Sequence, residues 1–399
     1  MDRIGWLIFV AALLVSVMLH ETGHFVVAKK FGMKVTRFFV GFGPTIWSTW
    51  RGETEYGIKA LPFGGFCKIV GMHSLDDPDD PADEPRSFRN KPAWQRIAVL
   101  SAGSAMHFLL ALVLLFGLAL GVGVEHYNTQ VGTLSPCLPV SLTAYNNGSC
   151  AGSHQASPAK LAGLRLGDVV TAINGRPVSN FNQLTDDVRP LPSGTPLTII
   201  VRRDGKLVTL HAKVASVKGL GSYLGVAPSG FVFQVPSPLS AIGYSGSTFG
   251  QVLVGSAQAI GQLPGGLHDL FNKKERANSA AGQVTSIYGA AQITGAELAA
   301  NVGWQYKVSF VVLLIASLNI FFGAFNLLPL LPLDGGHIAV VLYERIRAWL
   351  ARLRGRPDPG LVDMAKLLPV SFGLFMVLVI FSLVLIAADI VNPVSLTGG

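Results

Sequence analysis

His20, Glu21 and His24 form a His-Glu-x-x-His pattern, and these residue types can do chemistry at this spacing. Residues i and i+4 of a helix lie on one face, so both imidazoles can bind one Zn²⁺. Glu21 is offset by one position, where its carboxylate can take a proton from a zinc-bound water. The pattern is typical of metal-dependent peptide hydrolysis. The alternative is a chance match, which is common in soluble sequences.

The position of the pattern argues against chance. It lies inside an apolar segment, Ile4–Ala28, that is long enough to cross a bilayer. Ionisable side chains within a membrane span are costly and mark functional sites. The segment is also too long for a cleaved signal peptide and lacks a small-residue cleavage site. We therefore expect it to remain in the mature chain as a span.

Composition predicts a membrane protein with four transmembrane helices. Of the 399 residues, 50% are hydrophobic and 14% are charged. A span takes about 20 apolar residues. The stretches that meet this length are Ile4–Ala28, Ile97–Val124, Val308–Leu331 and Leu367–Ile390.

The net charge of +8 is concentrated in two loops, one between the first two spans and one between the last two. The positive-inside rule places both loops in the cytoplasm. Both termini and the segment from Glu125 to about Tyr306 are then extracytoplasmic. The basic excess therefore indicates topology rather than nucleic-acid binding.

The chain has three cysteines. Cys137 and Cys150 fall in the extracytoplasmic segment, where disulfides persist, and Cys67 falls on the cytoplasmic side. We expect a Cys137–Cys150 bridge and a free Cys67, with two unpaired thiols as the alternative.

Asp334 is the best third metal ligand. Pro329 and Pro332 break the third span, so Asp334 follows in irregular backbone. His20 lies about 24 Å along a helix from the start of the first span, near the cytoplasmic side of a core of about 30 Å. Asp334 is expected at the same level. A carboxylate that only supports a ligand is the alternative, and His337 is a weaker candidate ligand.

Two β elements are expected between the first two spans. Thr36–Ser48 is β-branched and aromatic and predicts a strand with a bend at Gly41 and Gly43. Tyr56–Ile69 predicts a hairpin around a turn at Pro62–Gly65. Its apolar content fits a hairpin that dips into the membrane.

The extracytoplasmic segment contains a stretch, about residues 156–228, that resembles a PDZ domain. It predicts a short helix, an Asn174-Gly175 hairpin turn, a helix over Phe181–Val188 and two strands joined at Asp204-Gly205. Residues 231–307 show no clear span and are expected as amphipathic pieces on the outer surface.

Together these motifs resemble the site-2 protease family, peptidase family M50. The closest likeness is to bacterial intramembrane zinc metalloproteases that cleave anti-sigma factors and signal-peptide remnants. The resemblance implies Glu21 as catalytic base and His20, His24 and Asp334 as ligands. It also implies a set of substrate-binding residues within the β elements and at the end of the third span: Asn326, Gly41, Gly43, Tyr56, Ile58, Phe66 and Ile69.

The chain departs from the family at the start of the second span. The family's Gly-Pro-x-x-Asn element reads Gly103-Ser-Ala-Met-His107 here. We therefore assign no site role to this element and expect His107 to be a buried, hydrogen-bonded histidine. One PDZ segment is visible, where some relatives have two.

The predicted fold is a polytopic α-helical membrane protein with a membrane-associated β-hairpin and an extracytoplasmic PDZ domain. The expected parts are residues 1–30, 31–96 with a linker, 97–124, 125–230, 231–307, 308–337, 338–366 and 367–399. The predicted function is zinc-dependent hydrolysis within the spans of single-pass membrane proteins that another protease has trimmed, in a bacterial plasma membrane. An inactive PDZ receptor is disfavoured by the intact Glu21, and a metal transporter by the absence of internal repeats.

Overall fold

The computed structural model of the chain describes residues 3–72, 81–140, 150, 152, 155–217, 221–266, 271 and 286–392. The chain divides into two compact units, residues 1–119 with 237–399, and residues 120–236. Residues 73–80 of the expected linker and residues 267–270 and 272–285 of the expected surface region lie outside the described part.

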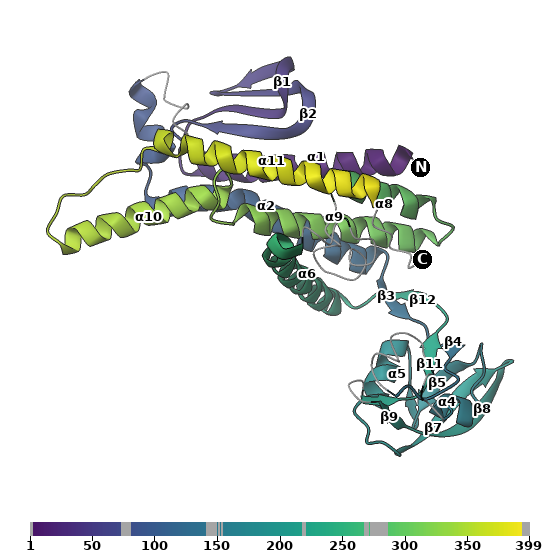
Figure 1. Ribbon diagram of the computed structural model, residues 1–399. Helices are drawn as coiled ribbons and strands as arrows, with labels where there is room; N and C mark the ends of the chain where they lie inside the picture. Colours follow the sequence, from purple (N-terminus) through teal and green to yellow (C-terminus); the bar gives the residue numbers. More distant parts are fainter. Residues whose placement is uncertain are drawn as a thin grey trace. The chain divides into compact units, whose positions relative to one another are not determined.

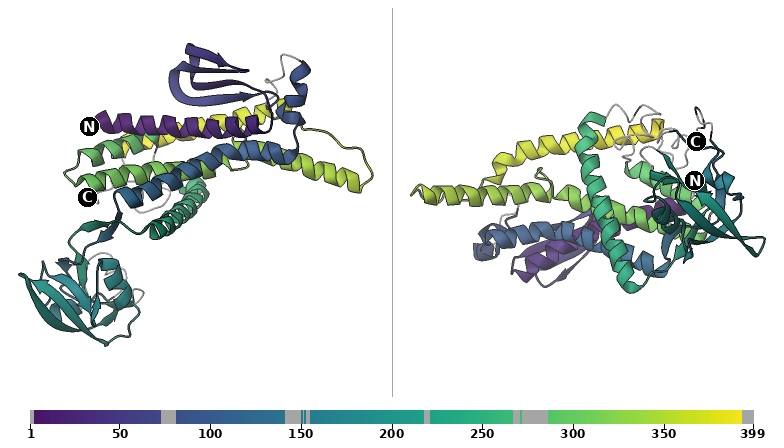
Figure 2. Two further views of the ribbon diagram at one scale, coloured as in Figure 1. Left: turned by 180° about the vertical axis from the view of Figure 1, so that it is seen from behind. Right: turned by 90° about the horizontal axis from the view of Figure 1, so that it is seen from below.

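The first unit consists of long helices and one twisted β element (Figures 1 and 2). Its helices run as α1 Arg3–Lys30, α2 Ala93–Gly121, α6 Pro238–Gly266, α8 Ile287–Ala299, α9 Trp304–Asn326, α10 Asp334–Leu353 and α11 Leu368–Val391. Short 3₁₀ turns lie at η1 Pro81–Arg86, η2 Phe88–Asn90 and η4 Met364–Leu367.

Within the described residues, four helices are long and apolar enough to cross a membrane, as predicted. Their bounds are Gly5–Lys30, Ala93–Gly121, Trp304–Asn326 and Met364–Val391. The third predicted span, Val308–Leu331, was too long, because the helix ends at Asn326 and not at Leu331. Pro329 and Pro332 cannot continue the helical hydrogen bonds, so the chain turns before α10 begins.

The β element between α1 and α2 differs from the predicted hairpin. Strand β1 (Val35–Arg51) pairs along its whole length with β2 (Thr54–Ile69). Val40 is opposite both Ile58 and Gly65, so the first half of β1 lies between the two halves of β2. The predicted partners around Pro62–Gly65 therefore do not pair with each other. A local pattern of turn residues could not reveal that a third segment lies between them.

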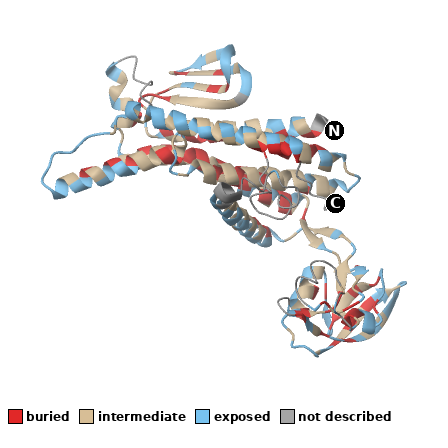
Figure 3. Cartoon of the chain, viewed as in Figure 1, coloured by how far each residue is buried: buried red, intermediate tan, exposed pale blue. Residues whose placement is uncertain are grey.

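The base of this β element packs on the helices. Met33, Val35 and Ile69 are fully buried, and they join one apolar cluster with Val99 of α2 and Val341 of α10. The cluster therefore connects α1, the β element, α2 and α10 at one end of the first unit (Figure 3).

Helices α6 and α8 occupy much of the region expected as amphipathic surface pieces. Phe249 of α6 packs against a cluster formed by α2 and α9, and its ring is 5.5 Å from that of Phe108. Helix α8 packs tightly on α1, where a Cβ at Gly5 would lie 2.8 Å from Gly295.

The second unit is a small β-rich body with its own core. Its principal sheet has the strand order β6-β5-β7-β8. Its elements are β3 Val124–Tyr127, β4 Val131–Leu134, α4 Pro158–Leu161, β5 Val169–Ile173, β6 Arg176–Pro177, α5 Phe181–Val188, β7 Pro196–Arg203, β8 Lys206–Lys213, β9 Ala215–Val217, β10 Gly221–Tyr223, β11 Val226–Pro228 and β12 Phe231–Gln234.

Local predictions in this unit are confirmed. Helix α5 spans Phe181–Val188, with Asn180 as the N-cap. Both predicted hairpin turns have two residues with positive φ: Asn174 and Gly175 at 48° and 77°, and Asp204 and Gly205 at 49° and 76°. These are the angles that a tight two-residue turn requires.

The cysteines of the second unit are joined. A disulfide connects Cys137 and Cys150, with their Cα atoms 5.8 Å apart, and Cys67 of the first unit is free. Burial raises the pKa of the Cys67 thiol, which disfavours its reactive thiolate.

Candidate active site

Three side chains from two helices converge in the first unit. His20 and His24 lie one turn apart on α1, and their Nε2 atoms are 3.0 Å apart. Asp334, the first residue of α10, places Oδ2 3.3 Å from His20 Nε2 and 3.4 Å from His24 Nε2. The three donor atoms thus form a nearly regular triangle.

This triangle fits a tetrahedral metal. Zinc binds imidazole nitrogen and carboxylate oxygen at about 2.0–2.2 Å, so neighbouring donors of a tetrahedron are about 3.3–3.5 Å apart. Asp334 Oδ2 is buried, and no hydrogen bond within the described residues satisfies it. The donor set therefore suits a zinc ion and leaves one coordination position for water or substrate.

Helix α2 orients the two histidines. His24 Nδ1–H donates to the Val99 carbonyl at 2.8 Å, which leaves the Nε2 lone pair facing Asp334. Gly103 lies directly against both rings, since a Cβ there would be 2.5 Å from His20 Cε1 and from His24 Nε2. Gly23 of α1 similarly faces the Ala102 carbonyl at 2.4 Å from its ideal Cβ.

Two glycines allow Asp334 to reach the histidines. A Cβ at Gly335 would lie 2.3 Å from the Leu327 carbonyl, and one at Gly336 would lie 2.6 Å from the Leu330 backbone. The segment between α9 and α10 is therefore folded closely over the first turn of α10. Asp334 stands at the N-terminus of that helix, where a negative charge is favoured.

The Glu21 side chain on α1 lies next to the segment Gly65–Ile69 of β2. The backbone N–H of Cys67 faces its carboxylate, and an ideal Cβ on Gly65 would be 3.7 Å from Glu21 Cγ. Glu21 thus follows the donor residue His20 in the sequence and lies next to the strand segment Gly65–Ile69.

His107 is buried and hydrogen-bonded, as expected. Its Nδ1 is 2.8 Å from Asn319 Oδ1 on α9, and Asn319 Nδ2 donates to Ser16 Oγ on α1 at 3.0 Å. The sequence analysis assigned no site role to the element that contains His107, and the structure places this element next to the donors: the His107 ring is 5.0 Å from the His20 ring, and Gly103 touches both histidines. This network ties α1, α2 and α9 together behind the histidines.

The residues predicted to bind substrate occupy different environments. Gly41 and Gly43 have φ of +84° and +83° and bend β1. Phe66 stacks on Phe39 with their ring centroids 5.5 Å apart, in the strand segment beside Glu21.

The other predicted substrate residues lie in three other environments. Tyr56 and Ile58 lie in the inner half of β2, which is paired on both sides. Ile69 is fully buried in the core. Asn326 is the last residue of α9.

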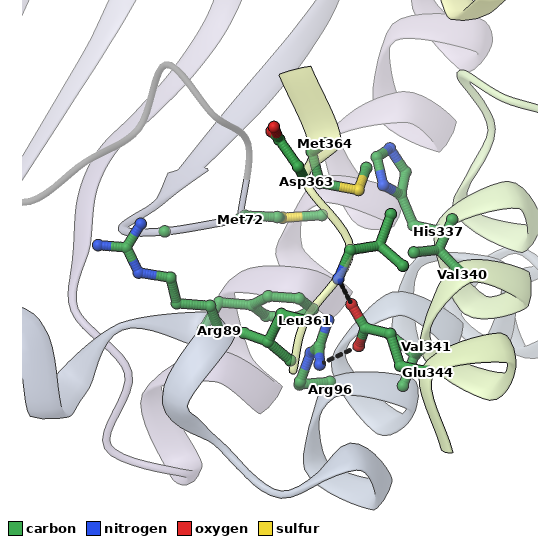
Figure 4. Close-up of a pocket in the computed structure, with 13 residues that line it drawn as sticks. Met72, Arg89, Arg96, His337, Val340, Val341, Glu344, Leu361, Asp363 and Met364 are labelled. Carbon is green, nitrogen blue, oxygen red and sulfur yellow. Dashed lines mark hydrogen bonds and ion pairs between the residues drawn. The ribbon is translucent and has the colours of Figure 1, made fainter. Parts of the chain in front are cut away.

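Sequence reasoning missed the supporting residues Val99, Gly103 and Asn319. A polar side chain inside an apolar span was the available signal for Asn319. Nothing local marks Val99, which contributes through its carbonyl. His337 lies one turn beyond Asp334 and lines a cavity of about 380 Å³ with Arg96 and Glu344 (Figure 4).

Comparisons with known proteins agree with a zinc-binding role for this cluster of donors. The family model described as Peptidase family M50 matches residues 8–356. The chain is 37% identical to a zinc metalloprotease named Rip1 from Mycolicibacterium smegmatis, with 99% of each chain covered, and 36% identical to Rip1 of Mycobacterium tuberculosis, with 98% covered. It is also 31% identical to a putative zinc metalloprotease of Nostoc, over 92% of this chain and 93% of that protein.

A match over most of the chain, together with relatives of this identity and coverage, defines the class of enzyme and its metal. The chain belongs to peptidase family M50, the site-2 proteases, and is a zinc metalloendopeptidase.

Proposed function

We propose that this enzyme hydrolyses peptide bonds within the transmembrane segments of single-pass membrane proteins. The observation that carries the proposal is the His20–His24–Asp334 triangle, with two of its donors on a helix that is apolar and long enough to cross a membrane. A hydrolytic centre at that depth is useful for a substrate that is itself embedded.

In this proposal His20, His24 and Asp334 hold the zinc, which when bound polarises the scissile carbonyl and activates water. Glu21 accepts a proton from the attacking water and passes it to the leaving amine. His24 keeps its metal-facing lone pair because Nδ1–H is committed to Val99. Gly103 allows both rings to sit against α2.

We infer that the substrate binds as an added strand on the segment Gly65–Ile69. A transmembrane helix must unwind before cleavage, and its exposed backbone groups then need partners. Strand addition to a sheet edge supplies them. Among the described strands, Gly65–Ile69 pairs with β1 on one side, and its Cys67 N–H points toward Glu21. In this proposal the substrate contacts the segment Gly65–Ile69 and not Tyr56 and Ile58, which the sequence analysis expected to bind it.

The charge pattern supports a placement in a bacterial plasma membrane with both termini and residues 125–306 outside. The second unit is then an extracytoplasmic PDZ domain. It has the helix and the two tight turns that this resemblance implies. Substrates with large outer domains would need prior trimming by another protease.

Glu21→Gln tests the function. It removes the base and leaves the three donors, so cleavage of a single-pass reporter in membranes should fall at least 1,000-fold, about 4 kcal/mol, while bound zinc stays stoichiometric. Glu55→Gln, a carboxylate of β2 paired with Arg37, is the control and should cleave normally. Full cleavage by Glu21→Gln would overturn the assigned role. Retention of zinc by Asp334→Ala would instead show that another residue is the third ligand.

A further inference from the structure

One face of α2 lies against both histidines of the donor triangle. Arg96, Val99, Gly103 and His107 are spaced by three, four and four residues and so lie along one stripe of the helix. Val99 and Gly103 contact the histidines, and His107 packs beside His20. Arg96 is the member of the stripe whose role the proposed mechanism does not explain.

Arg96 forms a buried ion pair with the helix that carries Asp334. Its Nη1 is 2.7 Å from Glu344 Oε2 on α10, and both side chains are about nine-tenths buried (Figure 4). The guanidinium also lies 5.2 Å from the Phe88 ring centroid. The other Glu344 oxygen, Oε1, accepts the backbone N–H of Val362 at 2.8 Å, from the segment that leads into α11.

The pair is placed where it can set the direction of α10. Glu344 is about 15 Å along the helix from Asp334, and Val341 adds an apolar contact on the same face. Because the helix is rigid, a contact at this distance fixes the direction of its axis and therefore the position of its first residue. A small rotation at Glu344 would move Asp334 Oδ2 out of the 3.3–3.4 Å range that it keeps with the two histidines.

Stability alone does not account for such a pair. Taking two charges out of water is costly, and well-packed apolar residues often replace a buried ion pair with no loss of stability. The Arg96–Glu344 pair therefore fits better with a need to hold α10 in one orientation than with a need for added folding stability.

We propose that Arg96 is a positioning residue of the metal centre. Through Glu344 it holds α10 so that Asp334 completes the donor triangle with His20 and His24. The proposal depends on the proposed ligand role of Asp334.

The test measures zinc affinity of the detergent-purified full chain by competition with a chelating dye, and thermal stability on the same samples. Arg96→Met and Glu344→Met each leave one buried charge unpaired, and should lower zinc affinity about 10–100-fold, the usual effect of a residue that orients a metal ligand. The double variant Arg96→Met/Glu344→Met leaves no unpaired charge and should fold with near-normal thermal stability. Its zinc affinity should remain reduced, and excess zinc should restore cleavage. Arg89→Met removes an exposed pair with Glu84 and should leave zinc affinity unchanged.

Wild-type zinc affinity in the double variant would overturn the proposal and make the pair a packing feature. The double variant decides the question even if both single variants fail to fold. Asp334→Asn, measured in parallel, separates this result from failure of the ligand assignment. If Asp334→Asn binds zinc normally, the assigned ligand is wrong and the positioning role falls with it.

Discussion

At the scale of single residues, the metal centre depends on glycines, which have no side chain, as much as on the three residues that supply ligand atoms. His20 and His24 approach α2 because Gly103 has no Cβ, and Asp334 approaches them because Gly335 and Gly336 have none. Glycine within a helix costs up to about 1 kcal/mol relative to alanine. Here that cost accompanies a close approach that no other residue permits.

Gly103→Ala should therefore destroy the metal centre. The new Cβ would lie 2.5 Å from both rings, far inside van der Waals contact, so one imidazole must turn away. We expect substoichiometric zinc and cleavage at least 100-fold slower, measured by metal analysis and a membrane reporter. Gly117→Ala on the same helix meets nothing within 4 Å and should be neutral or slightly stabilising. Equal zinc content in the two variants would contradict the packing argument.

At the scale of elements, charged side chains fasten the β element to its neighbours. Glu53, in the turn between β1 and β2, accepts two hydrogen bonds of 2.7 Å from Arg86 and one of 2.6 Å from Lys29 at the end of α1. The Arg86 guanidinium, and then Lys29, lower the pKa of Glu53 to about 2. The three residues connect α1, the β element and η1.

This contact predicts a pH dependence. Because the folded-state pKa of Glu53 is below its unfolded value, its stabilising effect is present above about pH 4.5 and disappears as the pH falls toward 2. Glu53→Gln should cost about 2 kcal/mol at pH 7, a discounted figure for a partly exposed group. The thermal stabilities of variant and parent should converge near pH 2. A difference that stays constant from pH 7 to pH 2 would refute the assignment.

The strand segment Gly65–Ile69 gives a second prediction at this scale. If the substrate pairs with the outer edge of this segment, Cys67→Pro should slow cleavage severely, because proline lacks the N–H donor that lies on that edge and faces Glu21. Cys67→Ala keeps the donor and should be mild. Both variants should retain zinc, as measured by metal analysis. Substrates with helix-breaking residues in their spans should be less affected, because less of their helix must unwind. Equal cleavage rates for the two variants would rule out strand addition at this edge.

At the scale of the whole molecule, the chain separates the chemistry from a second, independently packed unit. The donor triangle and Glu21 belong to the helical unit, and the core of residues 120–236 is built from its own strands and helices. We therefore expect the second unit to control access rather than to take part in hydrolysis.

Deletion of residues 156–228 should leave cleavage of a short substrate within about twofold of the parent and permit cleavage of an untrimmed substrate that the parent rejects. The physical reason is that a folded domain excludes bulky outer domains and supplies no catalytic group. The measurement is cleavage of paired short and untrimmed reporters by a zinc-loaded deletion variant. Loss of all activity on the short reporter would show that the unit presents substrate directly.

The sequence by itself determined whatever depends on neighbours along the chain. The i, i+4 spacing of His20 and His24, the apolar spans, and the Asn174-Gly175 and Asp204-Gly205 turns follow from local rules of helix and turn geometry. The third span was extended too far only because the end of a helix depends on where Pro329 and Pro332 redirect the chain.

Only the tertiary structure decided which distant segments meet. The insertion of β1 between the halves of β2, the contact of Val99 and Gly103 with the histidines, and the Arg96–Glu344 pair join residues that are far apart in sequence. Backbone carbonyls and missing Cβ atoms carry several of these contacts. A sequence pattern cannot specify them, because their effect depends on which surface packs against them.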